Sequence, residues 1–483
     1  MDAVQKPTRR SFLKTVTTTT AAWTCLGCLS SRLPGRGRSG VQPNIIFILA
    51  DDLGWKDVGF MGSAYYETPN LDKLAEQGVV FTNAYTNGPN CAPTRASLMS
   101  GQYTPRHGVY TVGSSERGQA RRRKLIPVAN KTTLEADVVT LAEALKPAGY
   151  VSASMGKWHL GNDPELGPVG QGFDLNVGGY EAGAPRSYFS PYRNPELADG
   201  PRGEYLTDRL TAEALKFIEV HRDRPFFLYL PHYAVHTPLQ AKKALIEKYQ
   251  KKGPRGGQGN AKYAAMVESL DAGVGRIMDK LDELRLADNT VVVFFSDNGG
   301  VRNITSMDPL RGGKGMLYEG GVRVPLVVRW PGVVQAGRRC DEPVIGIDFY
   351  PTLVEIAGTQ SPPGQILDGR SIVPLLRGAE TMADRALFWH FPAYLQGKAA
   401  GARDEYFRTR PAGAIRLGHW KLIEYFEDGI LELYNLKGDI GETTNLTREL
   451  PDKTEELHDK LIQWRQSVNA PVPTQLNPKY EPA

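Results

Sequence analysis

The stretch that decides the fold begins at residue 44 and reads NIIFILADD. An unbroken apolar run ends there in two adjacent carboxylates, Asp51 and Asp52. Apolar runs without alternation are typical of strands that are buried on both faces, as in parallel sheets. Three later runs, at residues 150–154, 225–230 and 291–295, each lead into a cluster of polar side chains. The sequence therefore predicts a mostly parallel sheet with polar groups at the ends of its strands.

Helical patterns lie between or beside these runs, at residues 71–78, 140–145, 204–219 and 261–286. In the last two, apolar side chains recur at helical spacing, so one stripe of each helix faces a core. Strands that alternate with helices favour an α/β fold with a doubly wound sheet flanked by helices. Ligands of such sheets bind beyond the carboxyl ends of the strands. The four polar clusters are therefore expected to meet at one site.

The N-terminus carries an export pattern. Residues 8–14 read TRRSFLK, which matches a twin-arginine signal, and the Thr-rich stretch 15–27 is too short and too polar to span a membrane. The run Leu26-Gly27-Cys28 resembles a lipoprotein cleavage site, which would make Cys28 a lipid anchor. We therefore expect export by the twin-arginine translocase of a bacterium, to the periplasm or the cell surface.

The pattern of the sequence changes after about residue 376, from long apolar runs to short strand patterns. Short strand patterns at 415–417, 420–423 and 431–434, with turn residues beside them, favour an antiparallel sheet, and a helical pattern follows at 452–467. We predict three parts: the export signal with a linker (1–38), a large α/β domain that carries the site (39–376), and a smaller C-terminal α+β domain (377–483).

Composition excludes some classes of protein. The net charge of +5 is mild, and no nucleic-acid recognition motif occurs, so no nucleic-acid partner is expected. Only Cys91 and Cys340 lie beyond the export segment, and we expect no disulfide between them. The basic run at 121–124 is interpreted as a solvated loop face, with attraction of a polyanionic substrate as the alternative.

Two of the polar clusters consist of hard oxygen ligands. Asp51 and Asp52 follow the first strand, and Asp297 and Asn298 follow the run at 291–295. Carboxylate and amide oxygens suit one divalent cation, Ca²⁺ in the first place and Mg²⁺ as the alternative, whereas zinc prefers His and Cys. Taken alone, each of these two pairs could simply cap a loop at the end of a strand, with no metal. Two pairs on one edge of a sheet favour the metal.

Cys91 opens the run CAPTRASLMSG at residues 91–101. Pro93 in the first turn favours a helix that begins at Cys91. A helix N-terminus attracts an anion and lowers the pKa of a thiol. The structural alternative is a buried thiol with no chemical role.

This run resembles the signature of the formylglycine-dependent sulfatases, Cys-x-Pro-Ser/Thr-Arg, a family of the alkaline-phosphatase-like superfamily. The Asp pair after the first strand and the turn 296–299 (SDNG) resemble the family's cation-binding motifs, in the same order. The resemblance implies that a formylglycine-generating enzyme, or an anaerobic sulfatase-maturating enzyme, oxidises Cys91 to formylglycine. The hydrate of that aldehyde would then be the nucleophile and a ligand of the cation. The resemblance also makes residues 39–376 the catalytic domain.

The resemblance also assigns roles to three positively charged side chains. Arg95, one turn after Cys91, would hold the hydrate oxygens. Lys157 follows the run at 150–154, and Lys314 lies in the Gly-rich segment 312–321 (GGKGMLYEGG). Both would bind the sulfate, for which a compact positive charge is suited.

Histidines supply the proton transfers that the resemblance implies. His236 would protonate the leaving alcohol, and His159 would take a proton from the hydrate; the pKa of histidine lies near neutrality, which suits both steps. His232 lies near His236 in sequence, and a structural role is as plausible for it.

The sequence thus predicts a sulfuric ester hydrolase that acts on a sulfated carbohydrate or an aryl sulfate. Two alternatives stay open. One is a formylglycine-dependent phosphonate or phosphodiester hydrolase of the same superfamily. The other is an exported, lectin-like protein without catalytic activity, which binds sulfated glycans and keeps Cys91 unmodified.

Overall fold

The computed structural model describes residues 42–482. The predicted export signal and linker at 1–38, including Cys28, lie outside the described residues. Among the described residues, none of the helices combines the length and the apolar character needed to cross a bilayer. The described cysteines, Cys91 and Cys340, are both free and both buried.

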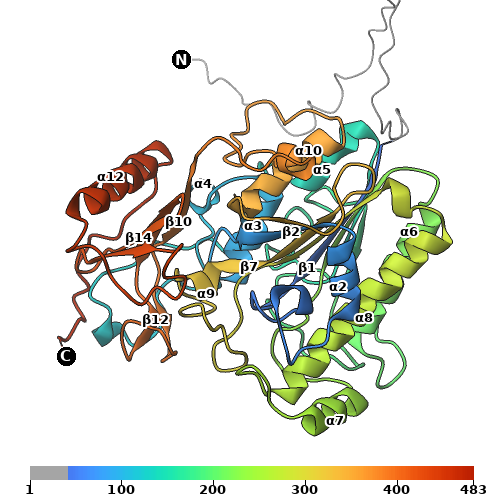
Figure 1. The fold of residues 1–483 in the computed structure, drawn as a ribbon, viewed down its shortest axis with the longest axis horizontal. Coiled ribbons are helices and arrows are strands. Elements are labelled where there is room, and N and C mark those ends of the chain that lie inside the picture. Colours follow the sequence, from blue (N-terminus) through green and yellow to red (C-terminus); the bar gives the residue numbers. More distant parts are fainter. Residues whose placement is uncertain (1–41, 483) are drawn as a thin grey trace, which may run out of the picture. The chain divides into compact units, whose positions relative to one another are not determined.

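A large, mostly parallel sheet forms the core, with strand order β4-β3-β5-β1-β6-β7-β2-β8 and with β9 paired to β2 (Figure 1). One strand, β7, runs antiparallel to both of its neighbours, β6 and β2. The predicted α/β fold with a mostly parallel sheet is confirmed. The strands of this sheet are β1 (Asn44–Ala50), β2 (Val79–Tyr85), β3 (Val151–Met155), β4 (Leu175–Val177), β5 (Phe226–Pro231), β6 (Thr290–Ser296), β7 (Arg323–Arg329), β8 (Arg338–Cys340) and β9 (Val344–Ile345).

Strand β1 explains why its sequence is apolar without alternation. Ile46 and Ile48 pack into one core, whereas Phe47 and Leu49 pack into a second core on the opposite face of the sheet. Successive side chains of a strand point to opposite faces, so a strand between two helical layers must be apolar at every position. The centre of the sheet is therefore buried on both sides.

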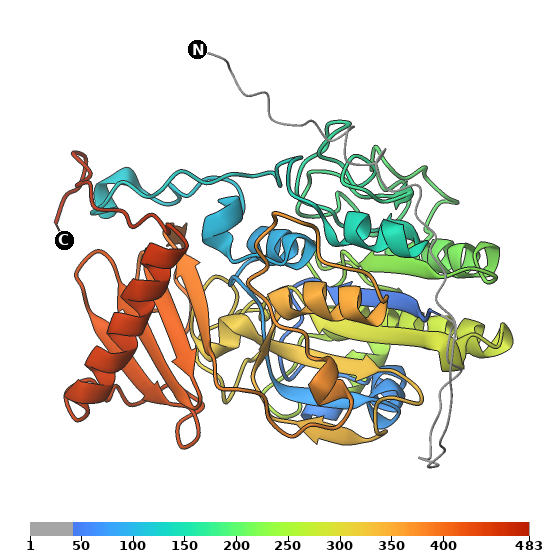
Figure 2. The same cartoon turned by 90° about the horizontal axis from the view of Figure 1, so that it is seen from above.

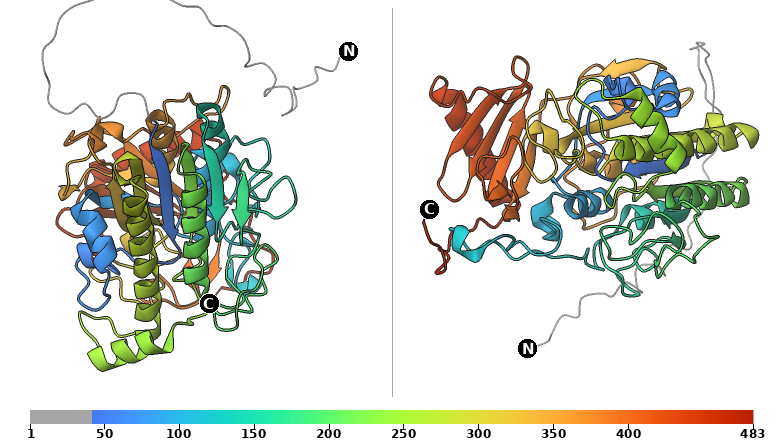
Figure 3. Two further views of the ribbon diagram at one scale, coloured as in Figure 1. Left: turned by 90° about the vertical axis from the view of Figure 1, so that its right-hand side faces the viewer. Right: turned by 90° about the horizontal axis from the view of Figure 1, so that it is seen from below.

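Helices α2, α6 and α8 cover the first core, and α3, α5 and α10 cover the second (Figure 3). The buried stripes predicted for α6 and α8 are confirmed. The helices of the large part are α2 (Pro69–Glu76), α3 (Cys91–Ser100), α4 (Thr104–His107), α5 (Leu141–Leu145), α6 (Leu206–Val220), α7 (Lys243–Lys252), α8 (Ala261–Glu283), α9 (Glu319–Val322), α10 (Phe349–Ile356) and α11 (Val373–Leu376).

A second, antiparallel sheet follows, of order β10 (Ala386–Phe391), β13 (Ala412–Leu417), β14 (Trp420–Tyr425) and β15 (Leu431–Asn435). Helix α12 (Pro451–Ser467) lies along it (Figure 2). The Trp464 ring stacks on Phe388 of β10, with 4.6 Å between the ring centroids. A short ribbon, β11 (Leu395–Gln396) and β12 (Phe407–Thr409), lies outside this sheet. The predicted C-terminal sheet is confirmed, and the boundary at 376/377 stays a prediction.

The basic run 121–124 is not the solvated face that we expected. Arg123 is buried, and its guanidinium donates to the carbonyls of Glu116 and Gly118 at 2.9 and 2.8 Å. Lys124 donates to the carbonyl of Glu427, and Arg122 lies 4.4 Å from the centre of the Tyr406 ring. Of the four, only Arg121 is exposed. Arg123 therefore fixes the preceding loop, because its guanidinium donates hydrogen bonds to several carbonyls of that loop.

Candidate active site

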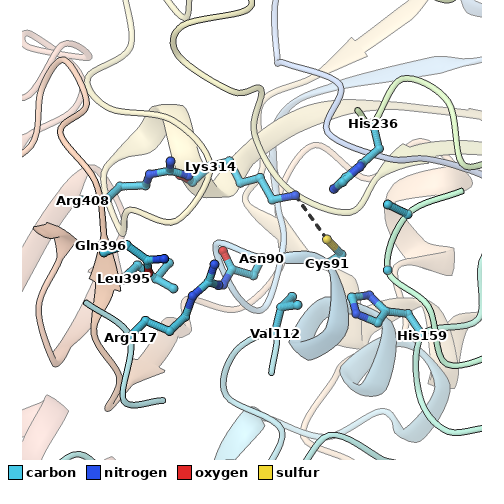
Figure 4. Close-up of a pocket in the computed structure, with 12 residues that line it drawn as sticks. Asn90, Cys91, Val112, Arg117, His159, His236, Lys314, Leu395, Gln396 and Arg408 are labelled. Carbon is cyan, nitrogen blue, oxygen red and sulfur yellow. Dashed lines mark hydrogen bonds between the residues drawn. The ribbon is translucent and has the colours of Figure 1, made fainter. Parts of the chain in front are cut away.

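The four polar clusters meet at the carboxyl ends of β1, β3, β5 and β6, beside a cavity of about 370 Å³ (Figure 4). Adjacent strands bring the clusters together: Ala50 pairs with Ser296, so the residues that follow these strand ends are neighbours. The cavity is lined by Asn90, Cys91, Val112, Arg117, His159, Gly183, Ala184, His236, Lys314, Leu395, Gln396 and Arg408.

The acidic groups form one buried cluster. The backbone N–H of Asp52 donates to Asp297 Oδ1 at 3.2 Å, and Asn298 Nδ2 donates to Asp52 Oδ1 at 2.8 Å. Asp52 has a φ of 64°, a left-handed conformation that is uncommon for a residue other than glycine. This backbone conformation is often found at functional sites.

Each carboxylate of the cluster has a cationic side chain within 2.8 Å. Lys157 Nζ lies 2.6 Å from Asp51 Oδ2, and Lys314 Nζ lies 2.5 Å from Asp52 Oδ1. Burial alone would raise the pKa values of Asp51 and Asp52, but the nearby cations hold both below their ordinary value.

Arg95 is the third cation and pairs with the third carboxylate. Its Nε and one terminal nitrogen donate to Asp297 Oδ2 at 3.0 and 2.8 Å, and its other terminal nitrogen donates to the carbonyl of Lys157 at 2.6 Å. Arg95 is fully buried and is not among the residues that line the cavity. In the described structure Arg95 therefore orients Asp297, and its predicted contact with hydrate oxygens stays a prediction.

Two buried oxygens of the cluster have no hydrogen-bond partner among the described residues: Asp51 Oδ1 and Asn298 Oδ1. Unsatisfied buried oxygens are rare and costly, and hard cations bind such oxygens. One ligand atom each from Asp51, Asp52, Cys91 and His236 lies within 4.8 Å of the others. These side chains therefore form a donor set that fits a divalent cation.

Asp297 is placed differently from the other predicted ligands. One of its oxygens accepts from Arg95, and the other accepts from the backbone of Asp52. Burial and the nearby Asp51 raise the pKa of Asp297 to about 7. A divalent cation would relieve this repulsion between neighbouring carboxylates, since it adds positive charge to the cluster.

Cys91 is the first residue of α3, as the sequence predicted, and its side chain faces the cavity. Its Sγ lies 3.4 Å from Lys314 Nζ. Burial raises the pKa of the thiol, against the lowering that we expected from a helix N-terminus. The desolvation of a fully buried sulfur outweighs the helix and the two nearby lysines.

His159 and His236 enter the cavity beside Cys91 (Figure 4). His159 Nδ1 is buried without a hydrogen-bond partner among the described residues, and burial followed by Lys157 places its pKa well below the ordinary value. His159 is therefore neutral and able to accept a proton. Gly183 packs on its ring: a Cβ there would lie 2.6 Å from Nε2.

His236 has its two nitrogens in different surroundings. Nδ1 lies 2.7 Å from the carbonyl of Thr237, and Nε2 lies 3.6 Å from Asp52 Oδ2. If Nδ1–H donates to that carbonyl, Nε2 is the nitrogen that exchanges a proton with the site. His232, in contrast, is fully buried, and it is not among the residues lining the cavity.

Sequence reasoning missed two arginines of the cavity. Arg408 lies on β12, and Arg117 lies in the loop that Arg123 orders. Neither follows a strand of the large sheet, so the rule that found the other clusters does not apply to them. Both residues come from segments without a periodic apolar pattern.

The chain matches known proteins over most of its length. The family model described as Sulfatase matches residues 43–359, and that described as N-sulphoglucosamine sulphohydrolase, C-terminal, matches 313–467. A sulfatase of Formosa agariphila is 38% identical over 89% of this chain and 90% of its own. Human N-acetylgalactosamine-6-sulfatase is 34% identical over 78% of this chain and 74% of its own.

A solved structure agrees with these matches. The crystal structure of Ps i-CgsB in complex with k-i-k-neocarrahexaose has a TM-score of 0.75 and 31% identity, and it covers 88% of this chain and 92% of that one. Together with the buried Asp cluster and the cavity at Cys91, these matches show that the chain belongs to the sulfatase family and is a sulfuric ester hydrolase of the alkaline-phosphatase-like superfamily.

Proposed function

We propose that this protein hydrolyses sulfate esters of a carbohydrate through a formylglycine that is made from Cys91. The observation that carries the proposal is the position of Cys91 at the start of α3. There it faces the cavity with Lys314 at 3.4 Å and with His159 and His236 beside it. A nucleophile there has a cation to neutralise sulfate oxygens and two histidines for proton transfer.

A divalent cation held by Asp51, Asp52, Asp297, Asn298 and the modified residue 91 would stabilise negative charge on the nucleophile and on the sulfate. The two unpartnered oxygens, Asp51 Oδ1 and Asn298 Oδ1, support this ligand set. The all-oxygen donors from the protein favour Ca²⁺, with Mg²⁺ as the alternative.

In the first step, one hydroxyl of the hydrated aldehyde, ionised by loss of its proton to solvent, attacks the sulfur of the ester through its oxygen. A new S–O bond forms, and the S–O bond to the sugar oxygen breaks. Lys314, which lines the cavity, neutralises the sulfate oxygens as charge moves to the leaving oxygen, and the buried Lys157 adds positive charge from its place beside Asp51. His236 protonates that oxygen from Nε2, and the sugar leaves as an alcohol.

In the second step, the remaining hydroxyl on the same carbon loses its proton to His159, which is neutral in its buried position. The electron pair forms the carbonyl, the C–O bond to sulfate breaks, and sulfate leaves. Water then hydrates the aldehyde again. A serine or cysteine sulfate lacks the second hydroxyl, so it would need direct attack by water; this difference is the chemical reason for modifying Cys91.

A sulfated carbohydrate is the substrate class that the similar proteins support. One of them is named N-acetylgalactosamine-6-sulfatase, and another was crystallised in complex with k-i-k-neocarrahexaose. We further propose that a formylglycine-generating or anaerobic maturating enzyme modifies Cys91 before the folded protein leaves the cytoplasm through the twin-arginine translocase.

Comparison of nitrophenyl sulfate with nitrophenyl phosphate tests the proposed reaction. We expect turnover of the sulfate to exceed that of the phosphate, because the one-cation site with its paired lysines suits a singly charged sulfate group. Turnover of the phosphate that equals or exceeds that of the sulfate would contradict the proposal. Binding of sulfated glycans without any turnover, by protein from the native host whose Cys91 is an unmodified thiol, would favour the non-catalytic alternative.

Removal of the cation is expected to lower the thermal midpoint of unfolding as well as the activity. A ligand that binds only the folded state at 100 times its Kd stabilises it by about 2.7 kcal/mol. Elemental analysis should find one divalent cation per chain, and titration of Ca²⁺ into chelator-treated protein should raise the midpoint.

The Ca²⁺-dependent part of that rise should disappear in Asp52→Asn. In a matched variant, Asp223→Asn, it should remain, because Asp223 is exposed and lies away from the cavity. An unchanged rise in Asp52→Asn would exclude the proposed ligand set.

A further inference from the structure

The cavity has two sides. Figure 4 shows Cys91, His159 and His236 on one side, and Arg117, Arg408 and Gln396 on the other, with Lys314 reaching between them. The first side carries the proposed chemistry. The second side has no part in the steps above, and the family motifs of the sequence do not include it.

We propose that Arg117 and Arg408 form a second anion subsite, which binds another negatively charged group of the same glycan while its sulfate ester lies at Cys91. This inference rests on the proposed function and narrows the substrate class. The substrate would carry a second sulfate or a uronic acid carboxylate near the ester that is cleaved.

The balance of charge in the cavity supports the subsite. Lys157, Lys314 and Arg95 each have a carboxylate partner within 2.8 Å. Arg117 and Arg408 have no ion pair with a carboxylate among the described residues, and no Asp or Glu lines the cavity. Two like charges beside one another in a partly buried cavity repel, and a bound anion would remove that repulsion. Burial, and then Arg117, lower the pKa of Arg408.

Arg408 is held in place without being neutralised. A terminal nitrogen donates to the carbonyl of Lys314 at 3.3 Å, and its Nε is buried without a partner among the described residues. The side chain passes Gly315, which has a φ of +89°, and a Cβ at that glycine would lie 2.8 Å from Arg408 Cδ. The Gly-rich segment therefore serves both cations: it carries Lys314 and leaves room for Arg408.

The loop of Arg117 is also a built element. Arg123 donates to the carbonyls of Glu116 and Gly118, which flank Arg117. The N–H of Tyr394 donates to the carbonyl of Ser115 at 3.0 Å, and this pairing sets the loop beside β11, which carries Gln396. The basic run thus contributes to the cavity indirectly: Arg123 fixes the loop that carries Arg117.

The chemistry of the two residues selects the class of ligand. A guanidinium offers planar, paired N–H donors that match the oxygens of sulfate and carboxylate groups. Gln396 adds a neutral amide that can bond a sugar hydroxyl. A cavity of about 370 Å³ admits a small saccharide unit.

Kinetics with defined sugars test the subsite. The probes are the positional isomers of galactose monosulfate, those of galactose disulfate, and galactose monosulfate linked to glucuronic acid. Arg117→Gln and Arg408→Gln should each lower, by about 10-fold or more, the ratio of kcat/KM for the doubly charged sugar to kcat/KM for the monosulfate. The doubly charged sugar whose ratio falls identifies the second anion. Arg408→Lys keeps the charge and loses the planar donors, so its ratio should lie between those of wild type and Arg408→Gln.

Arg121→Gln is the matched control, because Arg121 belongs to the same basic run but is exposed and does not line the cavity. Its ratio should equal that of the wild type. Unchanged ratios in Arg117→Gln and Arg408→Gln, or an equal fall in Arg121→Gln, would overturn the subsite.

Binding to the Cys91→Ala variant separates this inference from the proposed reaction. Calorimetry should show tighter binding of a doubly charged sugar than of the monosulfate, and Arg117→Gln in that background should remove the difference. If no sulfate ester is hydrolysed but this difference in binding is found, the proposed reaction fails and the subsite stands. Equal binding of all the probes to Cys91→Ala would overturn the subsite.

Discussion

Replacement of Cys91 by alanine is expected to lower sulfate ester turnover by about 10⁴-fold or more, since loss of a catalytic nucleophile has effects of this size or larger. The fold should survive, because the change removes one sulfur from the first turn of α3. Cys340→Ala is the matched control: Cys340 is also free and buried, but it does not line the cavity. It should retain activity near that of the wild type.

Mass spectrometry of the peptide that contains Cys91 is the companion measurement. Protein made with a maturation enzyme should carry a residue that has exchanged one sulfur and two hydrogens for one oxygen. Active protein whose Cys91 is entirely an unmodified thiol would disprove the formylglycine mechanism.

Cys91→Ser tests the second step in a host whose maturation enzyme oxidises only cysteine. Serine offers one hydroxyl and no second hydroxyl on the same carbon, so sulfate cannot be expelled by forming a carbonyl. We expect little or no steady turnover, with any reacted protein stalled as a serine sulfate. Steady turnover near that of the wild type by this variant would show that elimination from a hydrate is not needed.

Replacement of Lys421 by methionine is expected to lower the free energy of unfolding by about 3–5 kcal/mol, the usual result of removing one partner of a buried ion pair. Lys421 on β14 is fully buried, and its Nζ lies 2.9 Å from Glu319 Oε1 and 2.9 Å from Glu442 Oε1. Glu442 also accepts from the backbone N–H of Glu319 at 2.7 Å. The lysine therefore joins the C-terminal sheet to the first residue of α9, close behind the segment of Lys314.

Glu319 and Glu442 should respond differently to the removal of Lys421. Burial raises the pKa of Glu442 to about 7, with Glu319 adding to the shift, so this carboxyl can take up a proton. In the intact protein Lys421, followed by Arg323 and Arg416, holds the pKa of Glu319 at about 2 against its burial. When Lys421 is lost, Glu319 still keeps Arg323 and the Tyr85 hydroxyl as partners. Glu442→Gln in the Lys421→Met background should therefore recover part of the lost stability.

Urea unfolding followed by circular dichroism measures these effects. Lys437→Met is the matched control, since Lys437 is exposed in the turn that follows β15. Equal unfolding midpoints for Lys421→Met and Lys437→Met would contradict the proposed importance of the buried pair. Activity should fall together with stability in Lys421→Met, because the same contacts support the Gly-rich segment.

Much of the catalytic side of the cavity could be predicted from the sequence. Asp51, Lys157, His236 and Asp297 each follow an apolar run, and parallel strands place such residues at one edge of a sheet. The resemblance to the sulfatases added chemical roles, which geometry alone does not assign. The sequence could not show that Arg95 holds Asp297 or that burial raises the pKa of Cys91, because both depend on desolvation by distant segments.

The chain by itself determined the large sheet, the edge at which its ligands gather and the helix start at Cys91, since these depend on local periodicity and on the order of strands. Only the tertiary structure decided the other side of the cavity. Arg117 and Arg408 come from a loop and a short ribbon that are far apart in the sequence. Their positions depend on contacts with Arg123 and Gly315 and on a β-bridge between Glu116 and Tyr394. The periodic pattern of apolar residues in the sequence does not predict such contacts.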